Sequence, residues 1–177
     1  MTHAGSCGWP APGVQARLAD VAAGEGEVWV RGANVITHYW PRQPAQDAEG
    51  WFHTGDLASQ AADGSYTIVG RAKDLIISGG ENIHPAEIES LLCEHEGVME
   101  CAAFALPHER WGEVVAVAVV RAPGSAVSEQ QLRDLLEPRL ARYKWPGQWF
   151  WVDALPKTAL GKVQRQQLAR ECNTLAG

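Results

Sequence analysis

Residues 70–85 read GRAKDLIISGGENIHP, and the hydrophobic pattern of the chain changes within this segment. Upstream the sequence is typical of short strands broken by turns, whereas downstream strands and helices alternate. Leu75–Ile77 is predicted to be a strand, and Gly79-Gly80 a tight turn, because glycine tolerates positive φ angles. Pro85 suits a first helical turn, where its missing N–H would have no helical acceptor. We therefore expect two structural units to meet in this segment.

The upstream part, residues 1–70, predicts a small, twisted, mostly antiparallel β unit. Glu27–Arg31 alternates in polarity with the period of a half-buried strand. Ser65–Val69 follows Asp63-Gly64, a dipeptide typical of hairpin turns.

The downstream part predicts three helices interleaved with strands. The first helix begins at Pro85 with Asn82 or His84 as a cap, and the second has Ser128 as its N-cap. Pro138 should bend or divide the second helix. The elements after the first helix, which should run to Gly97, are expected at Val98–Leu106, Glu113–Arg121, 128–140, Gln148–Val152 and Val163–Glu171. The predicted fold class is α+β, a small twisted β subdomain followed by a compact mixed α/β domain.

Composition excludes several classes of protein. A net charge of -6 and a pI near 5.5 argue against a general nucleic-acid binder, which needs clustered Lys and Arg. The longest apolar run, Val114–Val120, is too short to span a membrane, and no signal-like segment opens the chain, so we expect a cytoplasmic protein. The four cysteines lack the spacing of a zinc site and predict free thiols and no metal site.

Two other short segments carry residues suited to chemistry. Residues 155–163 read LPKTALGKV and place Lys162 directly after a glycine, between a predicted strand and a polar helix. Residues 51–56 read WFHTGD and end in Asp56, whose carboxylate could accept hydrogen bonds from a ribose. Taken alone, each has an ordinary alternative, a solvated lysine in the first case and a β-turn in the second.

Together, the segments at 51–56, 70–85 and 155–163 resemble, in this order, the C-terminal third of the AMP-forming adenylating enzymes. Within that superfamily they resemble the acyl- and aryl-CoA ligases of the chlorobenzoate:CoA ligase kind. The resemblance implies that residues 1–72 are an incomplete C-terminal β subdomain of the AMP-binding domain. It implies that residues 73–177 are the AMP-binding enzyme C-terminal domain, a mobile lid.

The resemblance also implies roles in adenylation. Asp56 would bind the ribose of ATP and of the acyl-adenylate, and Arg71 would be a cation beside the same sugar and phosphate. Lys162 would be catalytic, because a positioned ammonium stabilises the charge that spreads as a carboxylate attacks the α-phosphorus and pyrophosphate leaves. Lys73 would be the hinge of the lid.

A CoA site is implied as well, with the residues Gly79, Gly80, Glu81, Trp111, Tyr143 and Lys144. Adjacent glycines leave room for a slender pantetheine arm, and the aromatic rings would flank the nucleotide. The relatives carry basic residues after Lys144, where this chain has Trp145-Pro146-Gly147. The nucleotide end of CoA would then stack on Trp145, bind residues outside this chain, or be held poorly.

The family's phosphate-binding loop and its acid pocket, which holds the glutamate ligand of Mg²⁺, have no counterpart in this sequence. We therefore expect a C-terminal piece of a ligase whose cofactors are ATP, CoA and Mg²⁺ and whose substrate is a fatty or aromatic carboxylic acid. Its partner would be the missing N-terminal domain, without which no adenylate should form. Two alternatives remain: a non-catalytic binding or regulatory remnant, and an adenylation domain that serves a carrier-protein thiol.

Overall fold

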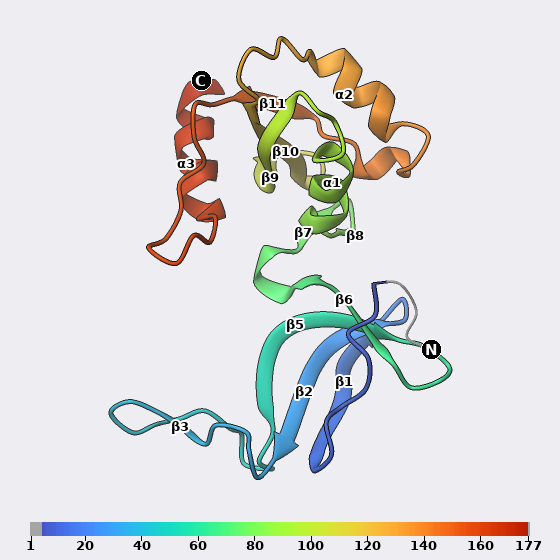
Figure 1. The fold of residues 1–177 in the computed structure, drawn as a ribbon, viewed down its shortest axis with the longest axis vertical. Helices are drawn as coiled ribbons and strands as arrows, with labels where there is room; N and C mark the ends of the chain where they lie inside the picture. The colour runs from blue at the N-terminus through green and yellow to red at the C-terminus, as the bar shows by residue number, and fades with distance from the viewer. Residues whose placement is uncertain (1–4, 177) are drawn as a thin grey trace. The chain divides into compact units, whose positions relative to one another are not determined.

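The computed structural model describes residues 5–176; residues 1–4 and 177, which the predicted domain ranges include, lie outside the described part. The chain divides into two compact units, one that ends at Lys73 and one that begins at Asp74. The first is built from strands, and the second combines strands with three α-helices (Figure 1). The predicted α+β class is confirmed. No helix within residues 5–176 is both long and apolar enough to cross a membrane.

The first unit is a four-stranded antiparallel sheet in the order β1-β2-β5-β6. Its strands are β1 (Val14–Ala22), β2 (Glu25–Gly32), β5 (Phe52–Gln60) and β6 (Tyr66–Arg71), and a separate ribbon joins β3 (His38–Tyr39) to β4 (Gln43–Pro44). The β5–β6 register places Asp56 directly opposite Arg71. Two of the residues named for nucleotide binding are therefore cross-strand neighbours.

The sheet of the second unit is built around β10 (Gly112–Arg121). This strand pairs antiparallel with β9 (Val98–His108) along most of its length and parallel with β11 (Gln148–Trp151). At Gly112 it also meets β7 (Ile76–Ser78), which forms a hairpin with β8 (Glu81–Ile83).

Helices cover both faces of this sheet, with α3 (Arg165–Ala176) on one side and α1 (Pro85–Leu92) and α2 (Glu129–Leu136) on the other (Figure 1). Successive side chains of a strand point to opposite faces. Thus Val117 of β10 packs in the cluster of α1 and α2, while the neighbouring Ala118 packs in the cluster of α3. Burial on both faces explains why β10 is an almost uninterrupted apolar run.

All three helices end at residues other than those predicted: the first ends early, the second ends at Leu136 instead of residue 140, and the last ends at Ala176 instead of Glu171. The first helix ends at Leu92 instead of Gly97, because the next residues form tight turns in which the amides of Glu94 and His95 bond carbonyls three residues earlier. His84 occupies the N-cap position, but its side chain makes no capping hydrogen bond. The last helix begins at Arg165 instead of Val163, because Val163 pairs with Lys157 across a loop.

The second helix begins after the predicted N-cap and ends before the proline that was expected to bend or divide it. Ser128 and Gln131 form a reciprocal capping box, in which the Ser128 side chain accepts from the Gln131 amide and the Gln131 side chain accepts from the Ser128 amide. The helix ends at Leu136, two residues before Pro138: Glu137 keeps helical backbone angles and its amide still donates to the Arg133 carbonyl, but Pro138 has no N–H with which to continue the helix.

Candidate functional site

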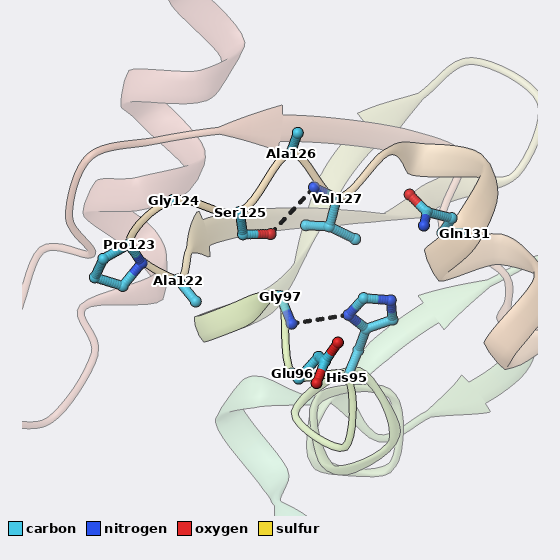
Figure 2. A pocket seen from close by; sticks show the side chains of 10 residues that line it. All are labelled: His95, Glu96, Gly97, Ala122, Pro123, Gly124, Ser125, Ala126, Val127 and Gln131. Atoms are coloured by element: carbon cyan, nitrogen blue, oxygen red, sulfur yellow. Dashed lines mark hydrogen bonds between the residues drawn. The ribbon is translucent and has the colours of Figure 1, made fainter.

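A shallow hollow of about 480 Å³ lies between the turn at residues 95–97 and the loop at residues 122–127 (Figure 2). Its polar groups bond locally: His95 Nδ1 accepts from the Gly97 amide at 2.9 Å, and Ser125 Oγ accepts from the Val127 amide at 3.2 Å. None of the residues named for function lines it. Within residues 5–176, no group of three or more His, Cys, Asp and Glu side chains could hold a metal ion.

Lys162 lies in a closed loop between β11 and α3. The Thr158 amide donates to the Lys162 carbonyl at 2.8 Å, and Thr158 Oγ1 accepts from the Lys162 amide at 3.2 Å. A β-bridge between Lys157 and Val163 closes the loop, and Gly161 turns it with φ +80°. The Lys162 side chain is exposed, and its ammonium has no hydrogen-bond or ion-pair partner among the described residues. The backbone is thus fixed while the charge stays available to an anion.

Lys157, the other lysine of this loop, forms an ion pair with a residue of the same unit. Its ammonium contacts the carboxylate of Glu100 on β9, and both side chains are about one-third exposed. The two lysines therefore differ in availability, and Lys157 provides a matched control for Lys162.

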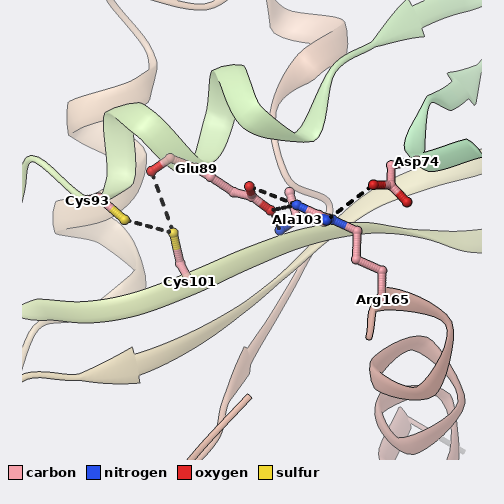
Figure 3. A network of polar contacts seen from close by, with 6 residues as sticks. All are labelled: Asp74, Glu89, Cys93, Cys101, Ala103 and Arg165. Carbon is pink, nitrogen blue, oxygen red and sulfur yellow. Dashed lines mark hydrogen bonds and ion pairs between the residues drawn. The ribbon is translucent and has the colours of Figure 1, made fainter. Parts of the chain in front are cut away.

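Arg165 ties four parts of the second unit together at the start of α3 (Figure 3). Its Nη2 donates to both carboxylate oxygens of Glu89 on α1, at 2.7 and 2.9 Å. Its Nε donates to the Ala103 carbonyl of β9 at 3.1 Å, and its Nη1 contacts Asp74 at 3.4 Å. Glu89 also accepts from the Ala103 amide at 2.8 Å. The network anchors the helix that begins three residues after Lys162.

Sequence reasoning did not single out Glu89. It follows the buried Ile88 on α1, where a polar residue is expected to face water. The local sequence is the same whether such a carboxylate faces water or a charged partner. Only the position of Arg165, 76 residues further along the chain, could have indicated it.

Asp56 and Arg71 form an ion pair on the first unit's sheet, with Asp56 Oδ1 2.9 Å from Arg71 Nε. Arg71 Nη1 also donates to the Thr54 carbonyl at 2.9 Å. The Gly55 amide donates to Glu27 of β2 at 2.8 Å, a contact that sequence reasoning missed. The Asp56 and Arg71 side chains remain 34% and 43% exposed, so both can still meet a ligand.

Close to this ion pair in sequence, His53 is held by two contacts on the same sheet. Its ring stacks on Trp29, with the ring centroids 3.8 Å apart, and its Nε2 lies 3.0 Å from Asp47 Oδ2. The hydrogen bond with His53 is the main cause that lowers the pKa of Asp47, and the amides of Trp51 and Glu49 also donate to this carboxylate.

We expect the Asp47 carboxylate to make the free energy of unfolding of the first unit depend on pH in the acid range. A folded-state pKa below the ordinary value of 3.8 contributes stability above pH 3.8, and that contribution is lost as the pH falls through the folded-state pKa. Urea unfolding should show that the difference between the native protein and Asp47→Asn shrinks between about pH 5 and pH 3. His53→Ala should reduce this acid dependence. A difference that stays constant with pH would contradict the linkage.

The Gly79-Gly80 turn and Trp111 meet at the edge of the second unit's sheet. Both glycines have positive φ, 59° and 91°, as the two-residue turn between β7 and β8 requires. The Gly79 amide donates to the Trp111 carbonyl at 2.9 Å, and a Cβ at Gly79 would lie 2.9 Å from the indole ring. Glu81 follows the turn as the first residue of β8. The structure therefore brings together four of the six residues named for CoA.

We expect Gly79→Ala to lower the free energy of unfolding by about 2 kcal/mol, from left-handed backbone strain and collision with Trp111. Gly80→Ala is the matched control, because nothing lies within 4 Å of its added Cβ. That variant should cost only the backbone strain, about 1 kcal/mol. Urea titration followed by tryptophan fluorescence measures both, and equal losses would show that the close approach to Trp111 has no energetic weight.

The other two residues named for CoA lie in a 3-10 turn at Arg142–Lys144. Lys144 Nζ contacts both carboxylate oxygens of Glu87 on α1, at 2.9 and 2.6 Å, and its side chain is only 18% exposed. Tyr143 is half-exposed. Trp145 packs against the core, and its indole N–H donates to the Leu140 carbonyl at 3.0 Å. The Lys144 charge is therefore compensated within the fold, and Trp145 is a packing residue instead of an open stacking surface.

Lys73 is exposed and lies within a short 3-10 turn at Ala72–Asp74, as the last residue of the first unit. This position is compatible with a hinge, and its role as the pivot stays a prediction.

Comparison with known proteins finds one matching family model and many similar sequences and structures. The model of the AMP-binding enzyme C-terminal domain matches residues 87–162. Indoleacetate–CoA ligase from Aromatoleum aromaticum is 45% identical over an alignment 181 positions long, gaps included, which covers 95% of this chain and 36% of that ligase.

Solved structures give the same relationship. The o-succinylbenzoate-CoA synthetase of Bacillus subtilis, in complex with an acyl-adenylate intermediate, aligns with a TM-score of 0.86 and 37% identity, over 93% of this chain and 35% of that one. ATP-bound MatB from Rhodopseudomonas palustris aligns with a TM-score of 0.84 and 35% identity, over 98% and 37%. The chain spans about a third of the length of these relatives.

Proposed function

This chain is related, over almost its whole length, to the C-terminal part of the AMP-forming acyl- and aryl-CoA ligases, and from that relationship we propose that it works in an acid–thiol ligase. The reaction converts a carboxylic acid, ATP and CoA into acyl-CoA, AMP and pyrophosphate. The chain contributes the lid that carries Lys162 and part of the nucleotide site. Adenylation also needs the region that corresponds to the other two thirds of the relatives.

The observation that carries this proposal is the available ammonium of Lys162 on a loop with a fixed backbone. Attack of a carboxylate on the α-phosphorus of ATP brings two anions together and spreads negative charge over the transition state. A cation held in place before the reaction stabilises that charge without a cost in reorganisation. Lys162 is the catalytic residue of this chain.

Asp56 and Arg71 bind the nucleotide. A partly exposed carboxylate can accept hydrogen bonds from both ribose hydroxyls, and the adjacent guanidinium can meet a phosphate oxygen. ATP and Mg²⁺ are proposed as cofactors because related synthetases have been solved with ATP and with magnesium. The glutamate ligand of Mg²⁺ is proposed to lie in the part of the ligase that corresponds to the other two thirds of the relatives. Lys73 is the hinge between adenylation and thiol transfer.

The glycine turn and Trp111 form the path of the acceptor thiol. Two glycines with positive φ present bare backbone beside an exposed indole, which suits a narrow pantetheine arm. Because Glu87 already neutralises Lys144, the nucleotide end of CoA gains less charge attraction here than a free lysine would provide. A carrier-protein thiol, which shares the pantetheine arm, is therefore the second acceptor to test.

A joined protein tests the proposal. The C-terminal 36% of indoleacetate–CoA ligase is replaced by this chain, and acid-dependent ATP–pyrophosphate exchange is measured with indoleacetate. We expect exchange in the joined protein and none with this chain alone. Thioester formation is then compared between CoA and a phosphopantetheinyl carrier. A joined protein that folds and binds ATP without supporting exchange would favour the non-catalytic alternative.

A further inference from the structure

Two cysteine thiols meet where the end of α1 crosses β9 (Figure 3). Cys93 is the C-cap residue that directly follows α1, Cys101 belongs to β9, and their Sγ atoms are 3.6 Å apart. Both are free thiols. The Sγ of Cys101 also lies 3.6 Å from the carbonyl oxygen of Glu89. This contact places the thiol pair beside the ion pair of Glu89 and Arg165.

Among residues 5–176, Cys93 and Cys101 are the only two cysteines whose thiols touch. Cys7 is exposed, and its thiol donates to the Tyr66 carbonyl at 3.1 Å. Cys172 is buried in the α3 cluster. The other two cysteines therefore provide internal controls, one open to solvent and one closed to it.

We propose that Cys93 and Cys101 are a redox modification site, which closes to an intramolecular disulfide when the protein meets a low-molecular-weight disulfide such as oxidised glutathione. A disulfide requires the sulfur atoms to approach to about 2.05 Å. Cys93 is exposed and caps the end of a helix, and its Sγ already lies 3.6 Å from that of Cys101, so closure needs the sulfur atoms to move by less than about 2 Å. The inference rests on the thiol geometry and is independent of the proposed ligase reaction.

The exposed Cys93 thiolate attacks one sulfur of oxidised glutathione, which forms a mixed disulfide and releases the first glutathione. Cys101 then loses its proton and attacks the Cys93 sulfur, which releases the second glutathione. Two protein thiols are oxidised, the reagent's S–S bond is reduced to two thiols, and the two protons pass through solvent to them.

The surroundings of the two thiols set this order. Burial raises the pKa of Cys101, and the neighbouring Cys93 and Glu89 raise it further. Cys101 is therefore a poor first nucleophile. Once Cys93 is in a mixed disulfide, its sulfur can no longer be an anion, so repulsion from Cys93 no longer opposes ionisation of Cys101. The second step is then favoured by proximity.

The test treats the folded chain with oxidised glutathione, blocks remaining thiols with an alkylating agent in denaturant, and maps the peptides by mass spectrometry. We expect a cross-linked peptide that contains Cys93 and Cys101, lighter than the two thiols by about 2 Da for the lost hydrogens, and reversal by dithiothreitol. Cys172 should remain a free thiol. Treatment in denaturant is the control for the folded geometry: it exposes Cys172, so adducts and disulfides that involve Cys172 should then form as well, although the short loop between Cys93 and Cys101 still favours that pair.

Single variants separate the steps. Cys101→Ser should accumulate a glutathione adduct on Cys93, and Cys93→Ser should leave Cys101 reduced. Cys7→Ser should form the same disulfide as the native protein. The proposal is overturned if the native protein keeps both thiols, or if a Cys93 adduct persists without closing on Cys101.

Discussion

Lys162→Ala should lower acid-dependent ATP–pyrophosphate exchange of the joined ligase about 100-fold to 1,000-fold, which corresponds to about 3 to 4 kcal/mol of transition-state stabilisation. The loss should appear mainly in kcat, because the ammonium is needed most when charge spreads over the attacking and leaving groups. The loop should keep its shape in the variant, since its hydrogen bonds are made by backbone groups and the Thr158 hydroxyl and not by the Lys162 side chain. Steady-state exchange kinetics at varied ATP measure kcat and KM separately.

Lys157→Ala is the matched control, because it removes a lysine five residues away in the same loop. Its ammonium is held by Glu100, so its removal should cost at most about 1 kcal/mol of stability and leave exchange nearly unchanged. Equal losses in the two variants would show a general need for positive charge in the loop. Full exchange in Lys162→Ala would remove Lys162 from the mechanism.

Arg165→Ala should lower the free energy of unfolding of the second unit by about 3 kcal/mol. The variant leaves the Glu89 carboxylate, only 18% exposed, with the Ala103 amide but without its cation. It also removes the bond to the Ala103 carbonyl and the contact with Asp74. Urea unfolding of the full chain, followed by circular dichroism, measures the change.

Arg170→Ala is the control on the same helix, since Arg170 is exposed and its loss should change stability by no more than about 0.5 kcal/mol. Glu89→Ala and the double variant complete a double-mutant cycle with Arg165→Ala. The double variant should lose less stability than the sum of the single variants, because each single change strands the other charge. Strict additivity would mean that the two charges do not stabilise each other.

Much of the fold followed from patterns that act over a few residues. The glycine pair predicted the turn between β7 and β8, and Ser128 predicted the start of α2. The boundary of α3 could not be predicted in this way, because Val163 is withdrawn from the helix by its bridge to Lys157. The end of α1 was likewise set by the tight turns that lead into β9.

The features of the candidate site fall into the same two groups, those that depend on near neighbours in the sequence and those that depend on distant residues. By itself the sequence determined that Lys162 follows a glycine between a strand and a helix, that Gly79-Gly80 forms a tight turn, and the class of fold, because these depend on patterns and steric limits between near neighbours. Only the tertiary structure decided which charges are free. Lys144 and Glu87 lie 57 residues apart, Arg165 and Glu89 lie 76 apart, and both pairs form only after the helices have packed on the sheet. The hydrophobic pattern around a charged residue does not identify its ionic partner elsewhere in the chain. Whether a lysine is free to bind an anion is therefore a property of the folded chain.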